Sequence, residues 1–276
     1  MARFDTKNVA RYWSNRHAPG LSMMHADFQT QEFAPHRHEA IVVAVTELGG
    51  TMIKSRGSVD QANASTLFVF NPSEPHESWM GASQHWRYRS IYLEQSAIEE
   101  VARGLGIESV PYFTRNPLND EDLVLKFLAL HRSLEEGRDA LCDRELLLVS
   151  FAALFQRHGS GNVRIESVPR DHVRINMAID YIHAMMAEPP SLGKLSAKLE
   201  ITQYQLISLF KRMTGLTPHA YVTQLRLDTA RKHLASGLPI GDAAIASGFY
   251  DQSALTRHFK RCYGVTPMQF VRAVRL

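Results

Sequence analysis

Three features that would place a protein in a membrane or an oxidising compartment are scarce or missing in this sequence. The 276 residues include only two cysteines, Cys142 and Cys262, so no disulfide framework is expected. No run of about 18 apolar residues occurs, and the opening residues MARFDTKNVARYW lack the apolar segment of a secretory signal. These absences predict a cytoplasmic protein with no membrane partner.

Acidic residues are in short supply only in the carboxy-terminal part of the chain. Residues 169–276 hold 14 Lys and Arg against 7 Asp and Glu, a net charge of +7. Residues 1–168 hold 17 against 21, a net charge of −4. A basic part beside a mildly acidic one is typical of a module that binds a polyanion joined to a module with another task. The length allows each part its own core.

One segment of the basic part occurs twice, at a constant offset of 49 residues. Ten positions out of 22 are identical between the copies. The identical pairs are Leu206/Leu255, Phe210/Phe259, Lys211/Lys260, Arg212/Arg261, Gly215/Gly264, Thr217/Thr266, Pro218/Pro267, Val222/Val271, Arg226/Arg275 and Leu227/Leu276. So many identities indicate one supersecondary unit used twice.

Each copy carries the signals of two helices joined by a short turn. Thr202 and Asp251 are the expected N-caps of the longer helices, because their side-chain oxygens can accept the first free backbone N–H groups. Shorter helices are expected before them, over residues 191–199 and 239–247. Gly215 and Gly264 suit left-handed C-caps, and Thr-Pro then starts the next helix. The predicted helix-turn-helix units cover residues 191–214 and 239–263.

The second copy resembles the signature of the AraC/XylS family. The matching residues are Ile245-Ala-Ser-Gly-Phe249, Ser253, Leu255, Arg257, Phe259-Lys-Arg261, Tyr263-Gly-Val-Thr-Pro267 and Phe270. The resemblance implies a DNA-binding domain over residues 169–276, in which a helix at 218–235 separates two recognition helices that enter successive major grooves. The first copy departs from the pattern, with Glu200 in place of a turn glycine and a turn one residue shorter.

The positions expected to be exposed on the recognition helices are the candidate DNA contacts. In the first copy they are Thr202, Gln203, Tyr204, Gln205, Ile207, Ser208, Lys211 and Arg212. In the second copy they are Asp251, Gln252, Ser253, Thr256, Arg257 and Lys260. Arg257 resembles a base-reading arginine and can bind guanine bidentately, Gln205 can pair with adenine, and Ile207 or Tyr204 can contact a thymine methyl. The late basic residues suit phosphate contacts or a solvated surface. The expected core residues are Leu206, Phe210, Ile245, Phe249, Leu255 and Phe259.

Short β-branched and aromatic runs separated by turns predict strands in the amino-terminal part. Strands are expected over residues 40–46, 51–54, 66–70 and 88–93, with Tyr88, Ser90 and Tyr92 on one face. Two helices are expected over 120–134 and 143–157, the second with Leu146, Val149, Ala153 and Leu154 on one side. The predicted class is α+β: a cupin-like β-barrel at 1–110, a helical region at 111–158, a linker at 159–168 and the all-α DNA-binding domain.

Three histidines stand beside predicted strands, in Pro35-His36-Arg37-His38 and Pro75-His76. They resemble the histidines of cupin barrels, but the cupin metal site also needs a glutamate where this chain has Val42 or Val43. No metal or other cofactor is therefore expected, although three imidazoles can ligate zinc. The histidines can instead line an effector pocket with Trp79 and Tyr92, or serve as structural residues at the barrel mouth.

The family resemblance implies a transcription regulator that responds to a small-molecule effector in the barrel. It implies that the helical region pairs two protomers into a homodimer, although these helices can equally cover the barrel alone. Double-stranded DNA is the expected partner, together with RNA polymerase if the regulator is an activator. No enzymatic activity is expected. The alternatives are a cupin-type metal-dependent enzyme fused to a DNA anchor, against which the missing glutamate argues, and a regulator that needs no effector.

Overall fold

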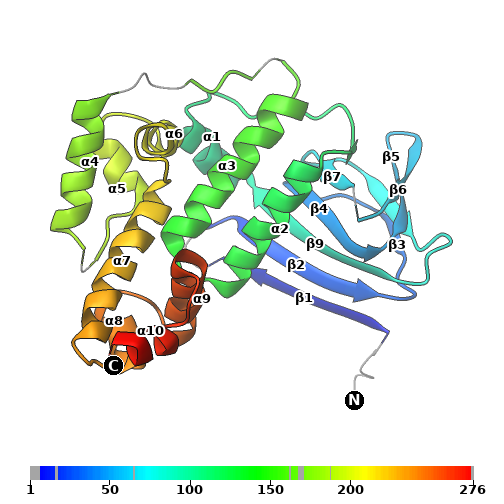
Figure 1. The fold of residues 1–276 in the computed structure, drawn as a ribbon. Helices are drawn as coiled ribbons and strands as arrows, with labels where there is room; N and C mark the ends of the chain where they lie inside the picture. The colour runs from blue at the N-terminus through cyan, green and yellow to red at the C-terminus, as the bar shows by residue number, and fades with distance from the viewer. Residues whose placement is uncertain are drawn as a thin grey trace. The chain divides into compact units, whose positions relative to one another are not determined.

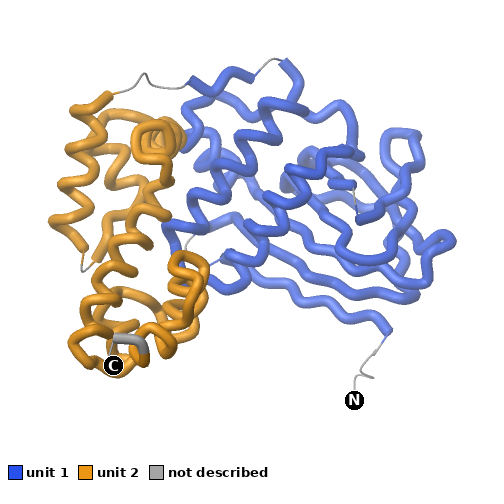
Figure 2. The backbone as a smooth tube through the Cα atoms, viewed as in Figure 1, with its two compact units in different colours: residues 1–166 blue, residues 167–276 orange. Residues whose placement is uncertain are grey.

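The computed structural model divides the chain into two compact units, residues 1–166 and 167–276 (Figure 2). It describes residues 7–15, 18–64, 66–161, 163–166, 171–186 and 188–274. Among these residues, Figure 1 shows strands in the first unit and only helices in the second, so the predicted α+β class is confirmed. Some predictions lie outside the described residues. They concern the amino-terminal residues 1–6, the linker and boundary residues 162 and 167–170, and the repeat residues Arg275 and Leu276.

The first unit contains two antiparallel sheets. The larger has the order β1-β2-β9-β4-β7-β10 and the smaller the order β3-β8-β5-β6. The strands of the larger sheet are β1 (Asn8–Ser14), β2 (Leu21–Phe28), β4 (Ala40–Gly49), β7 (Leu67–Phe70), β9 (Trp86–Glu94) and β10 (Pro117–Leu118). Those of the smaller sheet are β3 (Phe33–His36), β5 (Thr51–Ser55), β6 (Ser58–Ala62) and β8 (His76–Trp79). The four predicted strands are confirmed as β4, β5, β7 and β9. The strand β10 lies inside the region predicted to be helical.

The inner faces of the two sheets pack against each other. One buried cluster joins Val42 and Phe70 of the larger sheet to Ile53 of the smaller one. A second cluster joins Phe28 and Tyr88 to Phe33 of β3. Tyr92 packs against the first cluster, so β9 does turn Tyr88 and Tyr92 inward, as its alternation predicts.

Three helices accompany the larger sheet: α1 (Gln95–Leu105), α2 (Glu121–Glu136) and α3 (Ala140–His158). The helix α2 packs on β9 and β4, and α3 packs on both other helices (Figure 1). The helix α3 begins three residues before the predicted start at residue 143, and Asp139 caps it by accepting from the Leu141 and Cys142 backbone N–H groups. The predicted stripe on α3 is also wrong in part. Leu147, Leu148 and Phe151 are buried with Leu154, whereas Leu146, Val149 and Ala153 are only half-buried.

The second unit consists of seven helices among its described residues. They are α4 (His172–Ala184), α5 (Leu192–Lys198), α6 (Gln203–Thr214), α7 (Pro218–Ala235), α8 (Ile240–Ala246), α9 (Gln252–Tyr263) and α10 (Pro267–Val274). The predicted helix over 218–235 is confirmed as α7, with Pro218 in its first turn. One end of α7 packs its Tyr221 ring on Phe210 of α6, at 5.8 Å between centroids. The other end buries Leu227 and Leu234 against α8 and α9. The two predicted helix-turn-helix units therefore share α7 as their support.

The prediction that Ile245 belongs to the core is wrong. Ile245 is 63% exposed, whereas Ala243 and Ala244 are fully buried against α7 and α9. Each residue advances about 100° around a helix, so Ile245 turns away from the side that Ala243 and Ala244 occupy. The small alanines allow α8 to approach its neighbours closely.

The two turns reach the same conformation with different residues. Gly248 in the second copy has φ +81°, and Glu200 in the first copy has φ +54°. The left-handed region is favourable for glycine and costs about 1 kcal/mol or more for a residue with a Cβ atom. Glu200 therefore occupies the family's glycine position in the strained conformation that this position requires.

Candidate nucleic-acid interface and effector site

The start of α6 is held by a reciprocal pair of hydrogen bonds. Thr202 Oγ1 accepts from the Gln205 backbone N–H at 3.1 Å, and Gln205 Oε1 accepts from the Thr202 N–H at 2.9 Å. The predicted N-cap is confirmed, and the pair is a capping box. A bidentate adenine contact needs both the oxygen and the nitrogen of a glutamine amide, and here the oxygen of Gln205 already has a partner. The spacing Thr-x-x-Gln could have shown this in the sequence.

The prediction that Ile207 is exposed is also wrong. Ile207 is only 3% exposed and lies on the buried side of α6 with Leu206 and Phe210. Ile207 precedes Phe210 by three residues, so it extends the apolar stripe of the helix. The remaining candidates are half-buried or exposed. Gln203, Tyr204 and Ser208 are half-buried, while Lys211 and Arg212 at the end of the helix are exposed.

The helix α9 presents a more basic surface. Asp251 caps it by accepting from the Ala254 backbone N–H at 2.6 Å, which confirms the predicted N-cap. Leu255 and Phe259 are buried on the opposite side, as predicted. The side chains that line one hollow on this helix are Gln252, Ser253, Thr256, Arg257, Lys260 and Arg261. Five of the six are among the predicted DNA contacts, and Arg261, one of the late basic residues, lies beside them.

A polar link that the sequence did not reveal orients α9. The Tyr263 hydroxyl donates to Asp228 Oδ1 of α7 at 3.0 Å, and the Arg231 guanidinium lies 5.7 Å from the centre of the Tyr263 ring. Burial and the Asp228 carboxylate raise the pKa of Tyr263. Tyr263 also packs on Phe259 at 4.7 Å. These contacts determine which face of α9 turns away from α7.

The three histidines of the first unit lie together. His36 and His76 are paired residues of β3 and β8, and His38 follows just beyond β3. Their ring centroids are 4.4 Å apart for His36 and His76, and 5.3 Å for His38 and His76. Burial, together with the neighbouring His36 and His38, lowers the pKa of His76 to about 4. Burial, together with His36, also lowers the pKa of His38.

Of the other two candidates for the effector pocket, one joins the histidines and one does not. The Tyr92 ring lies 5.3 Å from His38, and Phe70 stacks on His76 at 4.1 Å. The prediction for Trp79 is wrong. Side chains alternate along β8, so Trp79 shares a face with Glu77, opposite to His76.

Comparison with known proteins assigns both units. A helix-turn-helix domain model matches residues 195–273, and an AraC-like ligand-binding domain model matches residues 18–150. The uncharacterized HTH-type transcriptional regulator YbfI of Bacillus subtilis is 30% identical over 224 residues, which cover 81% of each chain. This chain belongs to the AraC/XylS family. It is a DNA-binding transcription regulator with an amino-terminal ligand-binding domain.

Two further relatives of this AraC/XylS regulator each match a little over a third of it. The multiple antibiotic resistance protein MarA of Escherichia coli is 31% identical over 101 residues, covering 36% of this chain and 80% of MarA. A solved AraC-type regulator from Chromobacterium violaceum is 24% identical and covers 37% of this chain and 92% of its own, with a TM-score of 0.35. Within the described ranges, no helix has the length and apolar character needed to cross a bilayer.

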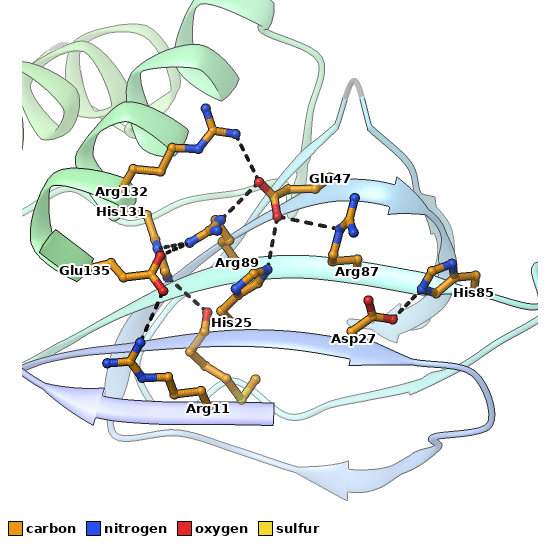
Figure 3. A network of polar contacts seen from close by, with 11 residues as sticks. Arg11, His25, Asp27, Glu47, His85, Arg87, Arg89, His131, Arg132 and Glu135 are labelled. Atoms are coloured by element: carbon orange, nitrogen blue, oxygen red, sulfur yellow. Dashed lines mark hydrogen bonds and ion pairs between the residues drawn. The ribbon is translucent and has the colours of Figure 1, made fainter. Parts of the chain in front are cut away.

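In this AraC/XylS regulator, the outer face of β9 is tied to α2 by a network of charges (Figure 3). Arg89 of β9 is the centre of the network: its Nε lies 3.0 Å from Glu47 Oε1, and its Nη1 lies 2.6 Å from Glu135 Oε2 and 3.0 Å from His131 Nδ1. His131 is buried, and its Nε2 lies 3.1 Å from the carbonyl oxygen of Met24 in β2. The network therefore joins β2, β4 and β9 to α2.

The network sets the protonation states of His131 and Glu47. Burial, together with the Arg89 charge, lowers the pKa of His131 to about 4, so His131 is neutral at pH 7. Burial alone would raise the pKa of Glu47, but the guanidinium groups of Arg89 and Arg132 lower it below its usual range. A neutral His131 can accept a hydrogen bond from Arg89 while it donates to Met24. The buried charges are thus each opposed by an opposite charge.

Proposed function

We propose that the regulator reads two different DNA sequences with its two recognition helices and responds to a small effector bound in the first unit. The hollow on α9 carries this proposal, because it combines Arg257 and Lys260 with the amide and hydroxyl groups of Gln252 and Ser253. In contrast, α6 has an uncharged early face with Gln203, Tyr204 and Ser208. We propose that the predicted residues on both helices contact DNA, except Ile207, which is buried and cannot reach the DNA.

Arg257 and Lys211 are expected to act differently. We expect Arg257→Ala to weaken binding to the preferred site by ~1–3 kcal/mol and to relax the preference at one base pair, since a bidentate arginine discriminates guanine from other bases. We expect Lys211→Ala to weaken binding to all sequences about equally, because phosphate contacts are not sequence-specific. Selection of randomised duplexes by the full chain, followed by titration of selected and scrambled DNA, measures both.

The same experiment can contradict the roles proposed for Arg257 and Lys211. A uniform loss of affinity for Arg257→Ala would show that Arg257 contacts phosphate rather than a base. A changed sequence preference for Lys211→Ala would show that Lys211 reads a base. Met268→Ala, at an exposed position of α10, is the control and should leave both measurements unchanged.

We further propose that the helical region 111–158 pairs two protomers into a homodimer. Leu146, Val149 and Ala153 lie on one side of α3 and remain half-buried, and Leu125 of α2 is exposed. An apolar side of this kind is typical of a surface that a second copy covers. We expect Val149→Glu to weaken self-association at least ~10-fold, since an unpaired charge would be buried.

Sedimentation velocity over a range of concentrations measures the self-association. The matched control is Gln156→Glu, which adds the same charge at an exposed position of α3. Equal association of both variants and the unmodified chain would exclude this side of α3 from the dimer. If the unmodified chain is monomeric at every concentration, the proposed dimer is wrong.

The remaining parts of the proposal concern partners and chemistry. A cytoplasmic regulator with domains at 1–110, 111–158 and 169–276, joined by a linker at 159–168, would bind DNA directly and contact RNA polymerase at the promoter.

We propose no catalytic role. Turnover of a small molecule by the purified protein would instead support the alternative of an enzyme fused to a DNA anchor. A thermal-shift screen of metabolites detects an effector, because a ligand of the native state raises its stability.

A further inference from the structure

The histidines of the first unit have the arrangement of a metal-binding site. Each of His36, His38 and His76 offers one ring nitrogen, and these three nitrogen atoms lie within 4.8 Å of one another. All three side chains are half-buried, so the cluster is sheltered and still reachable. Among the described residues this is the one cluster of His, Cys, Asp and Glu whose ligand atoms come together in this way.

Two of the rings are already oriented by the backbone. His36 Nδ1 lies 2.8 Å from the carbonyl oxygen of Ala34, and His76 Nδ1 lies 3.0 Å from the carbonyl oxygen of Glu74. A carbonyl oxygen only accepts, so each Nδ1 carries the hydrogen, and in the neutral ring Nε2 has the free lone pair. Metal-binding histidines characteristically donate their second ring N–H to such a group, which sets the tautomer and the ring direction.

The strand pairing brings these two rings to the same place. His36 and His76 are directly opposite each other in the β3–β8 ladder, so their side chains leave the sheet on one face. His38 follows two residues after His36, and its ring packs edge-on against His36 at 4.9 Å. Phe70 and Tyr92 close the cluster on the side of the buried core. Three ligands therefore come from two strand ends that neighbouring aromatic rings hold in place.

We propose that His36, His38 and His76 bind one divalent first-row transition-metal ion, which keeps an open position for an anionic small molecule. Three protein ligands and one open position are a common arrangement for such ions. In a tetrahedral site with metal–nitrogen bonds of about 2.1 Å, the nitrogen atoms are about 3.4 Å apart, so small ring rotations complete the set. The expectation of no metal depended on the missing glutamate, whereas three imidazoles suffice without it.

Because no carboxylate side chain joins the three histidines, the charge of the bound ion determines which ligand would bind at its open position. Val42, at one glutamate position of the cupin motif, is buried in the apolar cluster of the two sheets. The Glu74 side chain is engaged by Arg56, Asn71 and Asn116. An ion held by three neutral imidazoles keeps its full charge of about +2, which attracts an anion such as a carboxylate. The metal would thus be the recognition element for an anionic effector.

Cobalt(II) is a direct probe of this site, because its visible absorption reports coordination. The full-length protein is stripped with EDTA, dialysed and titrated with Co(II). We expect one equivalent per chain, with the strong visible bands of a four-coordinate nitrogen site. His38→Gln and His76→Gln should each weaken binding ~100-fold or more, since both remove a ligand. His85→Gln is the matched control, because His85 lies in the same unit and pairs with Asp27 outside the cluster.

The outcomes separate the parts of the inference. No Co(II) binding, or equal binding by the cluster variants and the control, would overturn the metal site. Far-ultraviolet circular dichroism shows whether each variant folds, and if His76→Gln does not, His38→Gln decides. Addition of azide should shift the visible bands of the bound Co(II); unchanged bands would refute the open position. The measurements use no DNA, so their failure would leave the proposed DNA reading by Arg257 intact.

Discussion

Replacing Phe259 by alanine is expected to destabilise the second unit by ~3–5 kcal/mol and to lower the temperature at which DNA binding is lost. The Phe259 side chain is fully buried between α7, α8 and α9. Its ring packs on Tyr263 at 4.7 Å and on Phe270 at 5.6 Å. Removal of the ring leaves a cavity that these neighbours cannot fill without tilting α9. The loss is a large share of the ~5–15 kcal/mol by which folded domains are typically stable.

Chemical denaturation of the full chain, followed by circular dichroism and by DNA binding, measures this effect. The helical signal of the second unit should be lost at a lower denaturant concentration, whereas the β-rich first unit should unfold as before. Met268→Ala is the control, because Met268 is exposed and its removal should change the free energy of unfolding by less than about 0.5 kcal/mol. A loss below about 1 kcal/mol for Phe259→Ala would contradict the packing described above.

Replacing Arg89 by alanine is expected to destabilise the first unit by about 3 kcal/mol. The side chain is only 11% exposed and opposes both Glu47 and Glu135. Its loss leaves two partly buried carboxylates with weaker partners and leaves His131 Nδ1 without its 3.0 Å neighbour. Removing one member of a buried charge network costs more than the network contributes, because the remaining charges lose their compensation.

The neighbouring Arg87 provides a matched control for Arg89. Arg87 lies on the same outer face of β9, but its side chain is 41% exposed and its Nε is 3.9 Å from Glu47. We expect Arg87→Ala to cost less than about 1 kcal/mol, as exposed ion pairs do. Denaturant unfolding of both variants, with the first-unit transition followed separately, makes the comparison. Equal losses for the two variants would mean that Arg89 contributes no more than a surface charge.

The sequence by itself determined most of the second unit, although the helix α4 was not predicted. The N-caps Thr202 and Asp251, the C-cap glycines and Pro218 are all local signals, and the repetition at an offset of 49 residues shows that they form one unit used twice. Each acts on backbone groups within four residues of itself, so helix boundaries could be predicted without knowledge of the packing. The family resemblance then supplied the function, because the signature residues are contiguous in the chain.

The direction in which side chains point was less predictable. Ile207 and Ile245 are both apolar residues of short helices, yet one is buried and the other exposed. Which side of a helix is covered depends on the residues that pack against it, and these come from elsewhere in the chain. The strands β1, β2, β3, β6 and β8 were missed for a related reason. Their sequences mix polar and apolar residues, and pairing with distant strands stabilises them.

The histidine cluster shows most clearly what only the tertiary structure decided. His36 and His38 are two residues apart in the sequence, but His76 follows His36 by 40 residues, and the motif around them lacks the glutamate of the cupin pattern. The β3–β8 register places His36 opposite His76 and turns Trp79 to the other face. Side chains alternate with a period of two, so a shift of one residue would have exchanged them. The sequence shows that the three histidines are present. Their rings come together only because long-range packing selects the register in which β3 and β8 pair.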